Sequence, residues 1–417
     1  MTSAKKTKKT ESTKDGKSHV HATDVAAYGK LAVDATLGVV DIVEKVHRRI
    51  ADTPGVLDGP IVKAISQTAD VVLSNIRSVT RATGEGIDLM VGKMAPLLGQ
   101  MESSAEREAI VSAFNGVLGD HLADSQNPLA ISMRIRREGK PLEMTSSSLQ
   151  GAIANISGKI LLVVHGSCMN DLQWRRNEHD HGAALAVQNG FTEVYLHYNS
   201  GLHISTNGRK LAILLEEMLS VWPVPVQEVV ILAHSMGGLV SRSACHYAAA
   251  NGSDWLSRLS RIFFLGTPHH GAPLERGGNW VTILLGAIPT TRAYSGLPKI
   301  RSAGITDLRY GSIVDEDWVD GDRFAHATVL PAVVSLPVSV KCYAIAAVLA
   351  KKSGPLSEQL IGDGLVPLPS ALGKHEDAKR TLVFPETRQV VYYGLNHVDM
   401  LDNQEIYAQM QRWIEID

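Results

Sequence analysis

The apolar positions of this chain follow two different periods, and the change of period divides it into regions. From about residue 22 to residue 122 they recur every three or four residues, as on one face of an α-helix. Pro54-Gly55 and Gly59-Pro60 interrupt the pattern. We expect residues 22–125 to form a small antiparallel helical region that buries these stripes. The alternatives are a cap over an active site and a surface for lipid or polymer granules.

The period shortens after residue 125, and residues 126–417 are expected to form an α/β domain. Ala130–Arg137, a turn at Glu138-Gly139-Lys140 and Pro141–Met144 predict an antiparallel hairpin. Beyond it, short apolar runs alternate with helical patterns, which predicts a mostly parallel sheet flanked by helices. Ligands of such sheets bind beyond the carboxyl ends of the strands. The expected strands are Lys159–Val164, Glu193–His197, Val226–Leu232, Ile262–Leu265, Val340–Ile345 and Gln389–Tyr393, and the expected helices are His181–Gln188, Asn207–Ser220, Met236–Ala250 and Asn403–Ile416.

The alternation stops between Ala272 and about Pro337. This segment contains the apolar helical stretch Trp280–Pro289, followed by a region rich in Gly and Asp. An insertion of this length at the active-site end of a sheet is interpreted as a cap or lid over residues 272–337. The alternative is that Ile283, Leu284 and Ile288 simply complete the core.

Composition narrows the class of protein. The 417 residues are 44% apolar and 20% charged, with a formal charge of −2, so no basic field for nucleic acid exists. Cys168, Cys245 and Cys342 lie far apart without metal-ligand spacing, which fits a reducing compartment. Residues 1–21 are expected to be a disordered basic tail, with a weak tether to an anionic surface as the alternative. Without a signal peptide or an apolar run of membrane length, a cytoplasmic protein is expected, with no cofactor and an oligomeric state left open.

The stretch Val229–Arg242 carries the first candidate chemistry. A short apolar run ends in Ala233-His234-Ser235-Met236-Gly237-Gly238 and is followed by helix-compatible residues. This is the pattern of a nucleophile elbow, in which a strained turn between strand and helix exposes a serine hydroxyl above the sheet. The alternative is a Ser-Gly turn without chemistry.

A serine hydroxyl needs a base within hydrogen-bond reach and an acid that orients the base. His397 follows the last expected strand, in Gly394-Leu395-Asn396-His397, and is the predicted base. Asp363, between two glycines after the strand expected at 340–345, is the predicted acid. The order Ser, Asp, His along the chain is the order used by folds with this elbow.

An oxyanion hole needs backbone N–H groups directed at the developing negative charge. The amide of Met236, at the start of the elbow helix, is one candidate. The other is expected in the turn after the first parallel strand, where Gly166 permits a tight turn and Ser167 supplies the amide.

Taken together, these segments resemble the α/β-hydrolase lipases and esterases, in particular those grouped with the GPI-inositol deacylase-like proteins. The resemblance covers roughly residues 155–417 and implies an α/β-hydrolase fold with Ser235, Asp363 and His397 as the triad and Ser167 and Met236 as oxyanion donors. It also implies substrate-binding positions at His165, Gly166, His234 and His269, although packing is an alternative role for His234 and His269. The segments are Val163-Val164-His165-Gly166, Ala233-His234-Ser235-Met236-Gly237-Gly238, Gly266-Thr267-Pro268-His269-His270-Gly271, Asp363-Gly364 and Asn396-His397.

Two features of the sequence depart from the pattern of minimal lipases. Ala233 replaces the first glycine of the elbow, as in some small bacterial lipases, and the helical region before residue 125 has no counterpart in them. Asp399 resembles a calcium-ligand position of some bacterial lipases, but no second ligand is identifiable, so no metal is predicted.

These observations predict a serine hydrolase of lipid metabolism that cleaves carboxylic esters, an esterase or lipase acting through an acyl-enzyme. The apolar insertion suggests a hydrophobic acyl ester. An acyltransferase or thioesterase of the same fold is one alternative, and an intracellular polyester depolymerase that contacts membranes or granules through its N-terminal helices is another. A non-catalytic binding protein on a hydrolase fold is the alternative from a different class.

Overall fold

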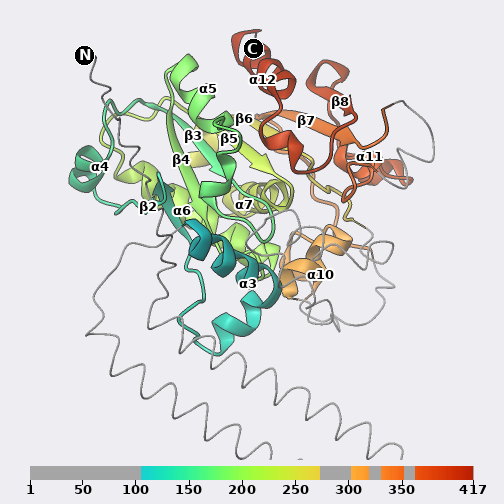
Figure 1. Cartoon of the computed structure of the whole chain (residues 1–417), viewed down its shortest axis with the longest axis horizontal. Coiled ribbons are helices and arrows are strands. Elements are labelled where there is room, and N and C mark those ends of the chain that lie inside the picture. Colours follow the sequence, from blue (N-terminus) through green and yellow to red (C-terminus); the bar gives the residue numbers. More distant parts are fainter. Residues whose placement is uncertain (1–104, 273–301, 319–329, 352–361, 417) are drawn as a thin grey trace, which may run out of the picture. The chain divides into compact units, whose positions relative to one another are not determined.

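The computed structural model describes residues 105–272, 302–318, 330–351 and 362–416 (Figure 1). The basic tail, the helices expected between residues 22 and 104 and the stretch Trp280–Pro289 lie outside the described residues. By contacts the chain divides into Met1–Arg107 and Glu108–Asp417. The second unit contains every strand that the structure describes.

The described residues form one eight-stranded sheet with the order β2-β1-β4-β3-β5-β6-β7-β8. The predicted hairpin is present as β1 and β2, which pair in antiparallel fashion, and β1 also runs antiparallel to β4. All other neighbours are parallel, as expected for an α/β sheet. The strands are β1 Arg134–Arg137, β2 Lys140–Pro141, β3 Lys159–Val164, β4 Thr192–His197, β5 Glu228–His234, β6 Leu259–Leu265, β7 Lys341–Val348 and β8 Gln389–Tyr393.

Helices cover the sheet where the helical patterns predicted them. Additional short helices occupy segments that the sequence pattern did not single out, and the described part of the 272–337 insertion contains α10. No helix in the described part of the chain combines the length and the apolarity that crossing a membrane requires. The α-helices are α3 Ala105–Asp124, α4 Ser146–Ala152, α5 His181–Asn189, α6 Ile204–Ser220, α7 Met236–Asn251, α8 Trp255–Arg258, α10 Ala303–Tyr310, α11 Leu368–Ala371 and α12 Gln404–Ile416.

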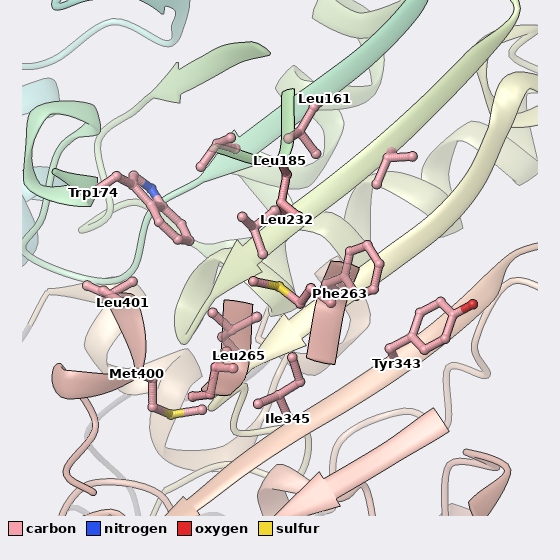
Figure 2. Packing of buried hydrophobic residues seen from close by; sticks show 14 of the residues in the cluster. Leu161, Trp174, Leu185, Leu232, Phe263, Leu265, Tyr343, Ile345, Met400 and Leu401 are labelled. Carbon is pink, nitrogen blue, oxygen red and sulfur yellow. The ribbon is translucent and has the colours of Figure 1, made fainter. Parts of the chain in front are cut away.

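The two faces of the sheet are separated by the alternation of side chains along each strand. Leu161 of β3, Leu232 of β5 and Phe263 of β6 share one core cluster with α5 and α12 (Figure 2). Trp413 of α12 stacks near Phe263 in this cluster, with 6.3 Å between ring centroids. Fully burying side chains of this size contributes about 1.5–3 kcal/mol each. Helices α6 and α7 pack against each other, and α7 also contacts β3 and β5.

The register brings the carboxyl ends of the central strands level. Val164 at the end of β3 is opposite Ala233 of β5, and His234 is opposite Leu265 of β6. The segments that follow β3, β5 and β6 therefore leave the sheet side by side. Those that follow β7 and β8 leave it at the next positions, so the predicted site residues converge at one edge.

Candidate active site

Ser235 is the residue between β5 and α7, and its backbone is strained. Its φ of +53° lies in a region that non-glycine residues rarely adopt. Such a conformation costs about 1–3 kcal/mol and persists only where the surroundings enforce it. Here the Ser235 amide donates to the carbonyl of Leu265 at 2.8 Å, and the Ser235 carbonyl accepts from the Gly238 amide at 3.0 Å. The sharp turn predicted for an elbow is present.

The two glycines after Ser235 allow α7 to begin close to the neighbouring strands. A Cβ at Gly237 would lie 2.6 Å from the carbonyl oxygens of both Val164 and His165. A Cβ at Gly238 would overlap the side chain of Thr267, which follows β6. Any larger residue at either position would force α7 away from the sheet. Ala233, where the elbow departs from glycine, is fully buried within β5.

Asp363 and His397 form a buried pair although 34 residues separate them. His397 Nδ1 lies 2.6 Å from Asp363 Oδ2, and the two residues are 2% and 1% exposed. Asp363 Oδ1 accepts from the amides of Leu365 at 3.0 Å and Val366 at 2.8 Å. The His397 amide also donates to the Asp363 carbonyl at 3.0 Å. With its carboxylate fixed in this way, Asp363 holds the hydrogen of His397 on Nδ1 and leaves Nε2 as the basic atom.

Gly266 lies against this pair directly after β6. A Cβ at Gly266 would lie 3.0 Å from His397 Cε1 and 3.2 Å from Asp363 Oδ2, and its φ is +57°. Ser235 bonds to the preceding residue, Leu265, so Ser235 and His397 flank the same turn. Ser235 Oγ and His397 Nε2 are both buried, and neither has a hydrogen-bond partner among the described residues. Such bonds are often long in a free enzyme and shorten when substrate binds.

The two predicted oxyanion amides belong to adjacent elements. Met236 is the first residue of α7, and Ser167 lies in the turn after β3. Among the hydrogen bonds of the described residues, none uses either amide as a donor. A Cβ at Gly166 would lie 3.1 Å from Ser235 Cβ, so the turn that contains Ser167 passes directly beside the serine. The amide of Met236 also lies at the positive end of the α7 dipole.

The turn after β3 is held from outside the sheet by α3. Cys168 has a φ of +60°, and its amide donates to Ser200 Oγ at 3.1 Å. A Cβ at Gly116 of α3 would overlap Cys168 Sγ and lie 2.8 Å from Cys168 Cα. One turn further along α3, the carbonyl of Gly119 accepts from Asn199 Nδ2 at 2.8 Å. These glycines allow α3 to fix the backbone beside Ser167.

The predicted substrate-binding residues lie around the site, and their imidazoles are buried. His165 donates from Nδ1 to the Gly166 carbonyl at 2.8 Å and stacks on Tyr198. His234 Nε2 lies 3.1 Å from the His397 carbonyl, which connects the elbow to the loop of the base. His269 packs edge to face against Phe264. Substrate contact by these residues stays a prediction, because their observed partners are protein groups.

Asp399 is the position that resembles a calcium ligand of some bacterial lipases. Its amide donates to Asn396 Oδ1 at 2.9 Å, in the loop that carries His397. Within the described ranges, no group of three or more His, Cys, Asp or Glu side chains could hold a metal ion.

Sequence reasoning missed the contribution of α3 to the site. Gly116 and Gly119 are three residues apart and therefore lie on one face of the helix, a spacing that permits close backbone approach. That spacing was the available signal. The residue that each glycine approaches, more than 50 positions away, left no local pattern.

The comparisons with known proteins concern the α/β domain. Residues 155–345 match the family model PGAP1, described as PGAP1-like alpha/beta domain, a range that includes Ser235 and ends before Asp363 and His397. No curated protein matches the chain. Solved structures similar to this chain include the mature lipase BlEst2 of Bacillus licheniformis, with 16% identity over 68% of this chain and 98% of that chain and a TM-score of 0.41.

Two further solved structures cover similar shares. The lipase-esterase related protein from Clostridium acetobutylicum is 12% identical over 62% of this chain and 96% of its own, with a TM-score of 0.34. YbtT, a type II thioesterase from the yersiniabactin biosynthetic pathway, is 13% identical over 63% and 94%, with a TM-score of 0.36. The family match and the sheet confirm the resemblance expected from the motifs. Residues 155–345 therefore resemble a PGAP1-like α/β domain, and the mostly parallel sheet with its flanking helices is that of an α/β-hydrolase fold.

Proposed function

We propose that this chain is a serine hydrolase that cleaves carboxylic esters through an acyl-enzyme. One observation carries the proposal. A strained serine with a buried, unpartnered hydroxyl flanks the same turn as a histidine whose other nitrogen is bound to a buried aspartate at 2.6 Å. This arrangement supplies a nucleophile, a base of defined tautomer and an acid that orients the base.

In the proposed first half-reaction, Ser235 Oγ attacks the carbonyl carbon of the ester while its proton passes to His397 Nε2. The resulting imidazolium is stabilised by Asp363, which stays ionised. The carbonyl oxygen becomes an oxyanion between the amides of Ser167 and Met236. Each such donor contributes about 3–4 kcal/mol of barrier reduction in comparable sites. His397 then gives its proton to the leaving alkoxide, and the acyl group stays on Ser235 as an ester.

In the second half-reaction, His397 Nε2 takes a proton from water, whose oxygen attacks the acyl carbon. The second oxyanion collapses when the bond to Ser235 Oγ breaks, and His397 returns the proton to that oxygen. The products are the alcohol of the first step and the carboxylic acid of the second. Both halves use the same donors and the same base, which is why a single arrangement of side chains suffices.

We propose hydrophobic acyl esters as the substrate class, on the basis of the apolar character of the 272–337 segment. A thioester or an alcohol acceptor would use the same Ser235, Asp363 and His397. Contact of the region before residue 105 with a membrane or granule stays a prediction, because that region lies outside the described residues.

The proposal is tested with a fluorophosphonate probe and a panel of p-nitrophenyl esters from acetyl to long acyl chains. We expect covalent labelling that peptide mass mapping assigns to Ser235, together with hydrolysis of at least part of the panel. Acyl-thioesters and alcohol acceptors in parallel reactions identify a thioesterase or an acyltransferase. Labelling at another residue, or no turnover of any ester or thioester by folded protein, would contradict the mechanism.

The contact between α3 and the oxyanion turn predicts a separate effect. We expect Gly116→Ala to lower kcat about 10- to 100-fold with little change in KM, because the added methyl group displaces Cys168 and with it the amide of Ser167. Overpacking at such a contact also destabilises the fold by about 1–3 kcal/mol. Ester kinetics and urea unfolding measure the two effects.

Gly151→Ala is the matched control for this variant. Gly151 lies on α4, and a Cβ there would meet no atom within 4 Å. Kinetics equal to the wild type are expected. If Gly116→Ala lost stability but kept kcat within about two-fold, well below the effect of one oxyanion donor, α3 would have a packing role only.

A further inference from the structure

Arg242, two turns into α7, is a buried charge without a carboxylate partner among the described residues. As a residue, Arg242 is only 5% exposed to solvent. Nη1 donates to the His269 carbonyl at 3.3 Å, and Nη2 donates to the Val334 carbonyl at 2.6 Å. Burial lowers the pKa of Arg242 to about 10, so the guanidinium stays charged at neutral pH. A buried charge compensated only by neutral carbonyls is costly, which favours an anion from outside the chain.

Two hydrogen-bond donors at this place lack acceptors. Arg242 Nε and His269 Nε2 are both buried and have no partner in the part of the chain that the structure describes. Arg242 Nη1 lies 3.5 Å from His269 Nδ1, and a guanidinium can only donate. His269 Nδ1 is therefore the acceptor, and Nε2 carries the hydrogen. A group that only accepts hydrogen bonds, such as a carboxylate or a phosphate, matches these donors.

A cavity of about 60 Å³ lies at these two residues. Its described lining is basic and neutral, with no Asp or Glu, and includes Arg380, His270 and His375. Neither Ser235 nor the pair of Asp363 and His397 lines it. Arg242 is seven residues beyond Ser235, which places it about 10 Å further along the axis of α7. The cavity therefore lies apart from Ser235, Asp363 and His397, and it shares the predicted substrate-binding residue His269 with the candidate active site.

A second cavity, of about 400 Å³, adjoins the first and shares Leu382 with it. Cys342, the second residue of β7, lines this larger cavity. The cavity therefore lies toward the amino end of β7. Much of its lining is apolar, including Leu336, Pro337, Val338, Val340, Val383 and Pro385. Exposed large apolar side chains gather on these two cavities, namely Leu330, Val333, Val338 and Val383. Such a gathering on a surface marks a binding site.

We propose that the two cavities together bind an anionic amphiphile. Its oxyanion head accepts hydrogen bonds from Arg242 and His269, and its aliphatic part lies along Val338 and Val340. A fatty-acid carboxylate and an alkyl phosphate share this chemistry. The site binds and does not react, and it does not depend on the ester hydrolysis proposed for Ser235.

The test compares decanoate, decyl phosphate and decanol by calorimetric titration into the full-length protein. We expect one or both anions to bind about ten-fold or more tightly than decanol, because hydrogen bonds to charged groups are strong. The better anion identifies the head group. Arg242→Met should reduce that preference to less than about two-fold, since only the charge-dependent part of binding is lost. Equal binding of decanol by the wild type, or a preference that survives Arg242→Met, would overturn the proposal.

Two further variants keep the test decisive. Arg258→Met, at an exposed arginine on α8, is the matched control and should bind like the wild type. Val338→Asp provides a second probe if Arg242→Met does not fold, because Val338 is fully exposed and its replacement leaves the core intact. We expect it to weaken decanoate and decanol alike, by about five-fold or more, since it places a charged group beside the aliphatic part that both ligands share. Unchanged decanoate affinity in Val338→Asp would count against the site. Binding of the anion at the candidate active site instead would also count against it, and such binding would survive Arg242→Met and Val338→Asp.

Discussion

Replacement of Ser235 by alanine is expected to lower ester turnover by about four to six orders of magnitude, as in serine hydrolases that lose their nucleophile. In the proposed mechanism His397 removes the proton of the Ser235 hydroxyl, and alanine offers the base no proton to remove. Some acceleration over water should persist, because the amides of Ser167 and Met236 still bind an oxyanion. Steady-state kinetics on p-nitrophenyl esters of the highly purified variant measure the loss.

Ser257→Ala is the control for this experiment. Ser257 lies on α8 and donates to the Asp254 carbonyl at 2.7 Å, far along the chain from the elbow. Its turnover should equal that of the wild type. If Ser235→Ala retained turnover within ten-fold of the wild type, the nucleophile would have to be sought elsewhere.

Acid is expected to destabilise the fold between pH 6.5 and pH 4. Burial lowers the pKa of His165 to about 4, that of His181 to about 4 and that of His197 to about 2. The unfolded chain takes up protons on these histidines below pH 6.5, whereas the folded chain does not. Their contribution to stability is therefore fully present above pH 6.5 and is lost as the pH falls toward the folded pKa values.

The size of this effect follows from linkage. Between pH 7 and pH 5.5 each of these three histidines removes about 1 kcal/mol, roughly 3–4 kcal/mol in total. His234 and His269, whose pKa burial lowers well below the usual value, act in the same direction. Asp171 opposes them in part, because burial raises its pKa to about 6 and its protonation then stabilises the folded state.

Urea unfolding at pH 7 and pH 5.5 measures the difference in the free energy of unfolding. His197→Gln should reduce that difference by about 1 kcal/mol, since glutamine can still accept from Arg136 Nη1, which lies 3.1 Å from His197 Nδ1. Ser257→Ala, which removes no titratable group, should leave it unchanged. A pH difference that is the same in the wild type and in His197→Gln would contradict this prediction.

The centre of the sheet could be predicted because the strands β3 to β7 are mostly buried on both faces and therefore appear as short apolar runs. The strand expected at Val226–Leu232 is found at Glu228–His234. The two residues at its end, Ala233 and His234, are buried within the sheet although neither is a strong strand former. Local propensity places such an element well and its ends poorly.

The candidate site was predictable as a set of residues but not as an arrangement. Ser235, Asp363 and His397 each follow a strand, which the sequence pattern indicated. Their convergence depends on the order of strands in space, with β5, β6, β7 and β8 as successive neighbours. The roles assigned to them stay predictions until the variants are measured.

Arg242 shows where sequence reasoning ends. It lies in the elbow helix, α7, among residues that are compatible with any ordinary helix. Segments around residues 269 and 334 reach it from distant parts of the chain and offer carbonyl oxygens. Contacts of this kind leave no periodicity or motif, so only coordinates reveal them.

The contact of α3 with the turn after β3 also constrains how this architecture can be recombined. Asn115 Nδ2 donates to the Leu129 carbonyl at 2.7 Å, and Ser302 Oγ donates to the Gly116 carbonyl at 2.7 Å. Helix α3 is therefore bonded to the segment that precedes β1 and to the segment that precedes α10. An exchange of N-terminal regions between related chains that joined them near residue 126 would separate Gly116 from Cys168. Crossovers upstream of residue 105 keep the whole of α3, and with it the contact between Gly116 and Cys168.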